Sequence, residues 1–201
     1  MAGIVIPFRG SGGKKRLTGL DGAAHHSVVL GMFTDVLEAA TAVNRTVVVT
    51  EDGDAREAAL AAGAEVVADP GGGQGAAVAA AMGLFLAEAV LVVNADVPCV
   101  QPYDLRSLIA ATPPGGIALV ASEDGRTNAL SLPAPELFEP LYGPGSAERF
   151  TRAARDLGVE VVVVAMPSIA DDVDTMDDLE RVQSRAGRHT QAALHGLTLS
   201  L

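Results

Sequence analysis

Short runs of apolar residues recur along the chain, and within each run the apolar positions are continuous rather than alternating with polar ones. The runs cover residues 3–7, 46–50, 64–68, 90–94, 117–121 and 159–165. Continuous runs of this length are typical of strands that are buried on both faces of a parallel sheet. The pattern therefore predicts a mostly parallel sheet at the centre of the fold.

Helix-like stretches lie between these runs. In the first of them, Val28, Met32 and Val36 follow one another at helical spacing. The stretches cover residues 23–43, 54–62, 76–88, 103–111, 147–157 and 175–184. Strands that alternate with helices predict an α/β fold, a three-layer sandwich with right-handed crossovers, and we expect residues 1–201 to form a single domain.

Two segments break the alternation. Residues 126–146 contain four prolines and no helical period, so we expect an inserted hairpin and loop that covers the sheet. The tail, about residues 186–201, ends in apolar residues. We expect it either to pack on a neighbouring subunit or to be disordered, and a homodimer through the tail or the hairpin is a further expectation.

Charge and cysteine content narrow the functional classes. The chain of 201 residues carries a formal net charge of -11, which repels nucleic acid and anionic membrane surfaces at long range, so we expect neither as a partner. A single cysteine, Cys99, excludes an internal disulfide. The N-terminus lacks the features of a signal peptide, and residues 76–93 include Glu88 and are too mixed for a membrane span. A cytoplasmic protein is expected.

The loop after the first run, "FRGSGGKKRL" at residues 8–17, concentrates glycines and cations in an otherwise acidic chain. Its members are Arg9, Gly10, Gly12, Gly13, Lys14, Lys15 and Arg16. The glycine spacing fits neither a P-loop nor a dinucleotide fingerprint. Two interpretations stay open, a solvated turn and a phosphate-binding loop of another type, and the cluster of cations favours the second.

Carboxylates follow two of the expected strands. Asp96 comes directly after the run at 90–94, and "DDVDT" at residues 171–175 comes after the last run. Each has a simpler explanation, since Asp96 precedes a turn at Pro98 and Asp174 is placed to cap a helix. Together with the basic loop, however, they favour a Mg²⁺ site at the carboxyl edge of the sheet. Asn94, two residues before Asp96, is expected to point the same way.

Five motifs in this order resemble one family. "IPFRGSGGKKRL", "NADVP", "GRTNAL", "YGPGS" and "DVDTMDDL" are similar to the guanylyltransferases of coenzyme F(420) biosynthesis, over about residues 3–184. The resemblance implies a Rossmann-like nucleotidyltransferase fold of the GT-A type. It also implies transfer of GMP from GTP to the phosphate of a small carboxylic acid, which is 2-phospho-L-lactate, phosphoenolpyruvate or 3-phosphoglycerate, with release of pyrophosphate.

The resemblance also implies roles for individual residues. Asp96, Asp172 and Asp174 match metal-binding positions for Mg²⁺, and Lys14, Arg16 and Asp96 are the expected catalytic residues. The nucleotide would be held by Gly10, Gly12, Gly13, Lys14, Arg16, Gly73, Gln74 and Gly75. The acceptor would be held by Thr127, Asn128, Gly143, Gly145 and Ser146. This chain departs from the family at Gln74 and Gly75, where a Leu-Asn pair is usual.

Two other functions fit the same fold. One is a nucleotidyltransferase of the molybdenum-cofactor type, against which the "TNAL" and "YGPGS" motifs argue. The other is a non-catalytic protein that binds a nucleotide without consuming it.

Overall fold

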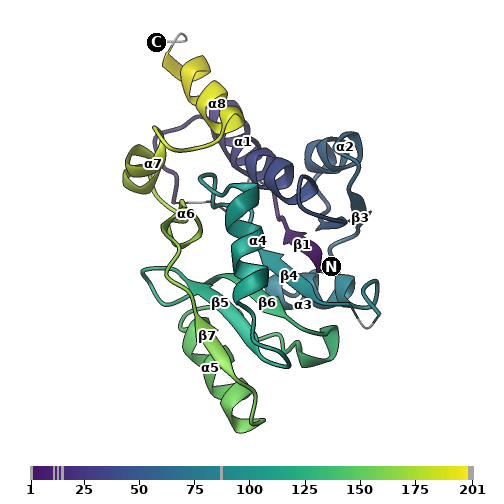
Figure 1. Ribbon diagram of the computed structural model, residues 1–201. Coiled ribbons are helices and arrows are strands. Elements are labelled where there is room, and N and C mark those ends of the chain that lie inside the picture. Colours follow the sequence, from purple (N-terminus) through teal and green to yellow (C-terminus); the bar gives the residue numbers. More distant parts are fainter. Residues whose placement is uncertain (1, 11, 13, 15, 87, 199–201) are drawn as a thin grey trace.

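A sheet of seven strands runs through the centre of the computed structural model (Figure 1), which describes residues 2–198 except 11, 13, 15 and 87. The strand order is β3-β2-β1-β4-β6-β5-β7. All pairings are parallel except the two that β6 makes with β4 and β5. The strands are β1 (Gly3–Pro7), β2 (Thr46–Val49), β3 (Glu65–Val67), β4 (Val90–Val93), β5 (Ile117–Ala121), β6 (Thr127–Leu132) and β7 (Val161–Val163).

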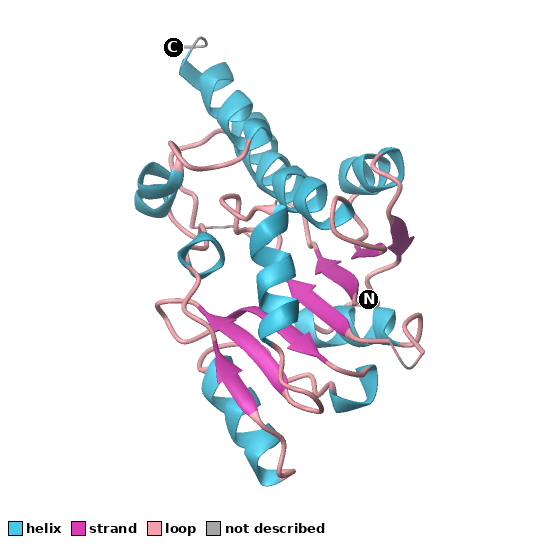
Figure 2. Ribbon diagram, viewed as in Figure 1, coloured by secondary structure: helices cyan, strands magenta, loops and turns pink. Residues whose placement is uncertain are grey.

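Helices cover both faces of this sheet (Figure 2). One core cluster joins the sheet to α1 (Gly22–Thr41), α2 (Gly53–Ala61), α4 (Pro102–Ala111), α6 (Pro167–Ala170) and α7 (Met176–Val182). The other joins the opposite face to α3 (Gln74–Met82) and α5 (Ser146–Asp156). The predicted three-layer α/β fold with a mostly parallel sheet is confirmed.

The continuous apolar runs are explained by these two clusters. Ile4 and Ile6 of β1 belong to the first cluster, whereas Val5 between them belongs to the second. All three side chains are fully buried, and each contributes roughly 1.5–3 kcal/mol of hydrophobic free energy. A central parallel strand therefore has no position where a polar side chain reaches water until the strand ends, and that is where the pocket residues begin.

Residues 126–146 do not form a hairpin of their own: they hold one strand, β6, which lies in the sheet and does not cover it. β6 pairs antiparallel with β4, with Leu130 opposite Val92, and every residue from Thr127 to Leu132 is buried. β6 alternates between the two core clusters, with Ala129 in one and Leu130 in the other, which is the behaviour of a central strand. The expected cover over residues 126–146 was wrong in this respect, and the loop begins only at Pro133.

The tail also differs from the expectation. Residues 188–198 form α8 (Arg188–Thr198), which packs on α1 of the same chain. Asp35 of α1 is buried and accepts hydrogen bonds from the backbone N–H groups of His189 and Thr190, both at 2.9 Å. A buried carboxylate thus satisfies the free N–H groups at the start of α8. The described part of the tail is therefore an ordered helix that packs on its own chain, and packing on a neighbouring subunit and the homodimer stay predictions.

The apolar region 76–93 is divided into a short helix and a strand. α3 ends at Met82, before Gly83, and not at residue 88 as expected. In the part of the chain that the structure describes, no helix combines the length and the apolar character that a membrane crossing requires.

Candidate active site

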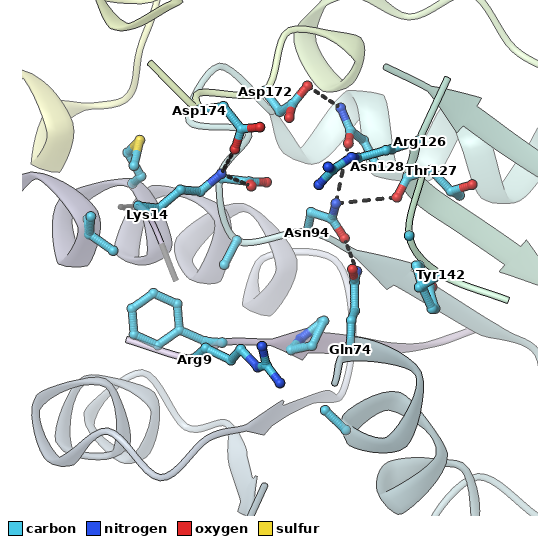
Figure 3. Close-up of a pocket in the computed structure, with 18 of the residues that line it drawn as sticks. Arg9, Lys14, Gln74, Asn94, Arg126, Thr127, Asn128, Tyr142, Asp172 and Asp174 are labelled. Carbon is cyan, nitrogen blue, oxygen red and sulfur yellow. Dashed lines mark hydrogen bonds and ion pairs between the residues drawn. The ribbon is translucent and has the colours of Figure 1, made fainter. Parts of the chain in front are cut away.

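A pocket of about 270 Å³ opens at the edge of the sheet where β1 and β4 end (Figure 3). β6 runs antiparallel to β4, so its first residue, Thr127, lies at the same edge. This is the edge at which open α/β sheets bind their ligands. The segments after β1, β3, β4 and β7 and the start of β6 therefore meet around one cavity.

Three carboxylates gather in this pocket, and two of them, Asp172 and Asp174, are labelled in the upper part of Figure 3. Asp96, Asp172 and Asp174 each offer an oxygen, and these oxygens all lie within 4.8 Å of one another. The backbone N–H of Val173 donates to the carbonyl of Asp96 at 2.9 Å, which ties the loop after β4 to the segment between α6 and α7. Burial, together with the neighbouring Asp96 carboxylate, raises the pKa of Asp172 to about 6.

Lys14 is the cation that lies among these carboxylates. Its ammonium group is mostly buried and donates to Asp96 and, at 2.6 Å, to Asp174. Burial disfavours the charge on Lys14, but the two carboxylates outweigh it, so its pKa lies above the usual value. Arg16, which is mostly exposed, pairs with Asp174 from the outside. Two of the predicted basic residues therefore contact the acidic cluster directly.

The alternative role for Asp174 as a helix cap is wrong. Thr175 caps α7, and the side chain of Asp178 completes a capping box with it. The Asp174 carboxylate is thus free to face Lys14. Burial opposes its ionisation, yet Lys14 and Arg16 hold the pKa of Asp174 below its ordinary value.

The carboxylate cluster fits a divalent cation. Asp96 Oδ1 is buried and has no hydrogen-bond partner among the described residues. A buried oxygen without a partner costs free energy, and Lys14 offsets only part of the repulsion among three close carboxylates, so a cation bound between them would relieve both. Oxygen-only ligands are the donors that Mg²⁺ prefers.

Two buried hydroxyl groups lie on the opposite side of the pocket. Ser146 Oγ, at the start of α5, accepts from the backbone N–H of Thr127 at 2.9 Å and donates to Thr127 Oγ1 at 3.1 Å. The Ser146 hydroxyl group therefore accepts one hydrogen bond and donates its only proton within the protein. The hydroxyl proton of Thr127 has no acceptor among the described residues, and Thr127 lines the pocket. It is placed to donate to an anionic ligand.

The loop before α5 is held by a single side chain. The guanidinium group of Arg149 donates to the carbonyls of Leu141, at 2.8 Å, and Tyr142, at 3.2 Å, and also to that of Pro144. Gly143 has φ 116° and Gly145 has φ 68°, conformations that favour glycine. The "YGPGS" motif is therefore a fixed turn that leads into the N-terminus of α5.

Gln74 starts α3 on the third side of the pocket. Its side chain donates to Asn94 Oδ1 at 2.6 Å. The neighbouring Gly75 is packed against the loop after β6, because a Cβ there would lie 2.8 Å from Pro140 Cβ and 3.0 Å from Pro140 O. The asparagine that is usual at this position would not fit without a shift of that loop, so the departure at Gly75 is matched to Pro140.

Most of the predicted site residues line this pocket. They are Gly10, Lys14, Gln74, Asp96, Thr127, Asn128, Gly143, Ser146, Asp172 and Asp174. Gly73 and Gly75 line an adjoining hollow, and Arg16, Gly12 and Gly145 lie outside both. Gly13 lies outside the described residues.

Among the other residues that line the pocket, four have polar side chains that the sequence did not assign to it, namely Arg9, Asp69, Arg126 and Tyr142. Arg9 belongs to the basic loop and had a signal there. Arg126 stands in the "GRTNAL" motif but received no predicted role, because only the antiparallel direction of β6 brings it to the pocket. The hydroxyl of Tyr142 is buried without a partner among the described residues, and burial raises its pKa well above the ordinary value, so it stays a neutral donor.

The chain is similar to known proteins over nearly its whole length. A family model described as "Guanylyl transferase CofC like" matches residues 2–201. A phosphoenolpyruvate guanylyltransferase of Roseiflexus castenholzii is 36% identical over 183 residues, which cover 89% of this chain and 85% of that protein. The chain belongs to the CofC-like guanylyltransferase family. This confirms the predicted family and the nucleotidyltransferase class, over the molybdenum-cofactor and non-catalytic alternatives.

Other relatives and structural neighbours of this CofC-like chain carry names that specify other substrates. A 3-phospho-D-glycerate guanylyltransferase of Phenylobacterium zucineum is 31% identical, covering 98% of this chain and 97% of that protein. Among solved structures, a proposed nucleotide-diphospho-sugar transferase from Desulfovibrio desulfuricans has a TM-score of 0.78 at 17% identity, covering 98% of this chain and 95% of that one. At that identity the likeness supports the fold alone.

Proposed function

We propose that this chain transfers GMP from GTP to the phosphate of a three-carbon phosphorylated acid and releases pyrophosphate, as a step in coenzyme F(420) biosynthesis. Phosphoenolpyruvate and 3-phosphoglycerate are the acceptors named for its relatives, and 2-phospho-L-lactate shares their chemistry. The observation that carries the proposal is that one pocket holds both the carboxylate cluster with its unpartnered oxygen and the free hydroxyl proton of Thr127.

The carboxylate cluster would serve the nucleotide phosphates. Asp96, Asp172 and Asp174 would hold Mg²⁺, which supplies charge neutralisation at the phosphate under attack. Lys14 lies against two of these carboxylates, and Arg16 pairs with Asp174 from the solvent side. Lys14 would hold phosphate oxygens and stabilise the departing pyrophosphate from within the pocket, and Arg16 would do so from outside it.

The hydroxyl side of the pocket would hold the acceptor. The Thr127 hydroxyl, the backbone at Gly143 and the N-terminus of α5 together form a concave group of donors for a carboxylate or phosphate. An acceptor phosphate is already ionised at neutral pH, so the reaction needs positioning more than a general base.

In the reaction, an oxygen of the acceptor phosphate forms a bond to the α-phosphorus of GTP. The bond from that phosphorus to the bridging oxygen breaks, and pyrophosphate leaves with the electron pair. The residues of the pocket bind and orient the two anions, and Lys14, Arg9 and Arg126 offset their combined charge.

Pyrophosphate release tests this proposal. Each of the four nucleoside triphosphates is combined with each of the three acids in Mg²⁺, and the product is identified by mass. Release that requires both GTP and one acid, and that stops on addition of EDTA, is the expected result. Release with every nucleotide, or release without an acid, would refute guanylyl transfer.

A further inference from the structure

A chain of side-chain amides crosses the floor of the pocket, from Gln74 to Asp172 (Figure 3). Gln74 Nε2 lies 2.6 Å from Asn94 Oδ1, and Asn94 Nδ2 lies 3.3 Å from Asn128 Oδ1. Asn128 Nδ2 lies 3.1 Å from Asp172 Oδ1. The chain thus joins the helix start on the nucleotide side to a carboxylate on the metal side.

The direction of this chain is fixed at its buried end. Asn128 is buried, and its side-chain nitrogen also lies 2.9 Å from the carbonyl of Ile169 and 3.2 Å from that of Ala170. Carbonyl oxygens only accept, so that end of the amide must be the nitrogen. The oxygen of Asn128 then faces Asn94 and requires a donor there.

The same logic passes along the chain. Asn94 must direct its nitrogen to Asn128, and this nitrogen also lies 3.3 Å from the carbonyl of Thr127. Its oxygen therefore faces Gln74, which must donate. The carbonyl oxygen of Gln74, together with one of its two N–H groups, is left without a partner among the described residues, and Gln74 lines the pocket.

We propose that Asn94 and Asn128 are positioning residues that set the orientation of the Gln74 amide on the nucleotide side and the position of Asp172 on the metal side. This inference rests on the proposed function, and it changes the role expected for Asn128. Both polar atoms of Asn128 are satisfied within the protein, so it acts through its neighbours instead of holding the acceptor. Gln74 replaces the usual leucine, so this chain has a connection between the two sides that a leucine could not make.

The first experiment measures binding of a fluorescent GTP analogue in EDTA, so that any effect through the metal is removed. Asn128→Ala is expected to weaken binding about 3- to 10-fold, because the lost hydrogen bonds release Asn94 and then Gln74. In a Gln74→Leu background the same change should cost less than about 2-fold, because leucine cannot use the chain. Equal losses in both backgrounds would show a merely structural role and overturn the proposal.

The second experiment measures binding of Mn²⁺ alone by electron paramagnetic resonance. Asn94→Ala, whose side chain lies against no carboxylate of the cluster, is expected to weaken Mn²⁺ binding about 3-fold through Asn128. Asn44→Ala is the matched control, since it removes an amide that bonds only the carbonyl of Ala2, far from the pocket. Equal Mn²⁺ binding by Asn94→Ala and the unaltered protein would overturn the metal end of the chain.

The two arms also separate this inference from the function. An unaltered protein that binds Mn²⁺ but no guanine nucleotide would refute the proposed function, and the Mn²⁺ arm would then decide the inference. An unaltered protein that binds neither would refute both.

Discussion

The two sides of the pocket are built from opposite ends of their strands and helices. On the side proposed to hold the nucleotide, Lys14, Gln74 and Asp96 follow the carboxyl ends of parallel strands β1, β3 and β4. On the side proposed to hold the acceptor, Thr127 stands at the beginning of a strand and Ser146 at the beginning of a helix. The antiparallel direction of β6 brings its first residues to the edge where the parallel strands end, so one insertion supplies the second half of the site.

Such an arrangement would let one sheet edge hold a nucleotide and a second anionic substrate side by side. The parallel half keeps the usual arrangement of loops and helix N-termini. The antiparallel strand brings Thr127 to the same edge, where we propose that its hydroxyl group donates to a second anion. Asp96 and Asp172 lie where the two halves meet. The hydrogen bonds from Asn94 to Asn128 and from Asn128 to Asp172 connect the two halves.

The largest effect is expected at the carboxylate that both sides share. Asp96→Asn keeps the size of the side chain but removes the charge, and kcat with GTP and phosphoenolpyruvate should fall about 1000-fold. The measurement is steady-state pyrophosphate release. Asp177→Asn, an exposed position on α7 with the same charge change, is the control and should stay near the unaltered rate. A fall of less than about tenfold would contradict the role of Asp96.

The next effect is a smaller loss of kcat/KM, which should be larger for the buried cation, Lys14, than for the exposed one, Arg16. The side chain of Lys14 is 13% exposed and that of Arg16 is 62% exposed. Lys14→Met should therefore lower kcat/KM for GTP about 100-fold, and Arg16→Met about tenfold or less, because solvent screens the exposed charge. The same assay compares the two variants. Equal losses would mean that burial of Lys14 has no bearing on its contribution.

The contact between the two sides can be broken at Gly75. Gly75→Asn should lower the free energy of unfolding by about 1–3 kcal/mol, because the new side chain collides with Pro140. Urea unfolding measures the change. Gly53→Asn, where a Cβ meets nothing within 4 Å, is the matched control.

A second variant keeps this prediction falsifiable. In a Pro140→Gly background the cost of Gly75→Asn should be smaller, because the colliding Cβ is gone. Strictly additive losses would show that the two positions are independent.

The smallest effect concerns pH. Asp172 has a folded-state pKa of about 6, above its unfolded value, so its protonated form stabilises the fold at low pH and this contribution is lost as the pH rises through about 6. Mg²⁺ should therefore raise Tm more at about pH 7.5 than at about pH 5, where the Asp172 carboxyl group is largely protonated. Thermal unfolding in Mg²⁺ and in EDTA tests this. A Tm increase that is equal at the two pH values would count against Asp172 as a ligand.

The sequence predicted the nucleotide side more completely than the acceptor side. A parallel strand ends in a polar residue at the ligand edge, so Asp96 and the basic loop were visible from the apolar runs alone. Thr127 and Ser146 were assigned only through the family resemblance, because nothing local shows that β6 enters the sheet between β4 and β5. The contact of Gly75 with Pro140 and the packing of α8 on α1 depend on residues far apart in the chain, which local patterns do not report.

The measurement that tests the two-sided site most directly is a pair of crossed titrations. KM for GTP and KM for the acceptor acid are determined for Gln74→Leu and for Thr127→Val. We expect Gln74→Leu to raise KM for GTP about 3- to 10-fold and to leave KM for the acceptor acid unchanged. We expect Thr127→Val to raise KM for the acceptor acid by a similar factor and to leave KM for GTP unchanged. If either variant raised both KM values equally, the division of the pocket into a nucleotide side and an acceptor side would be wrong.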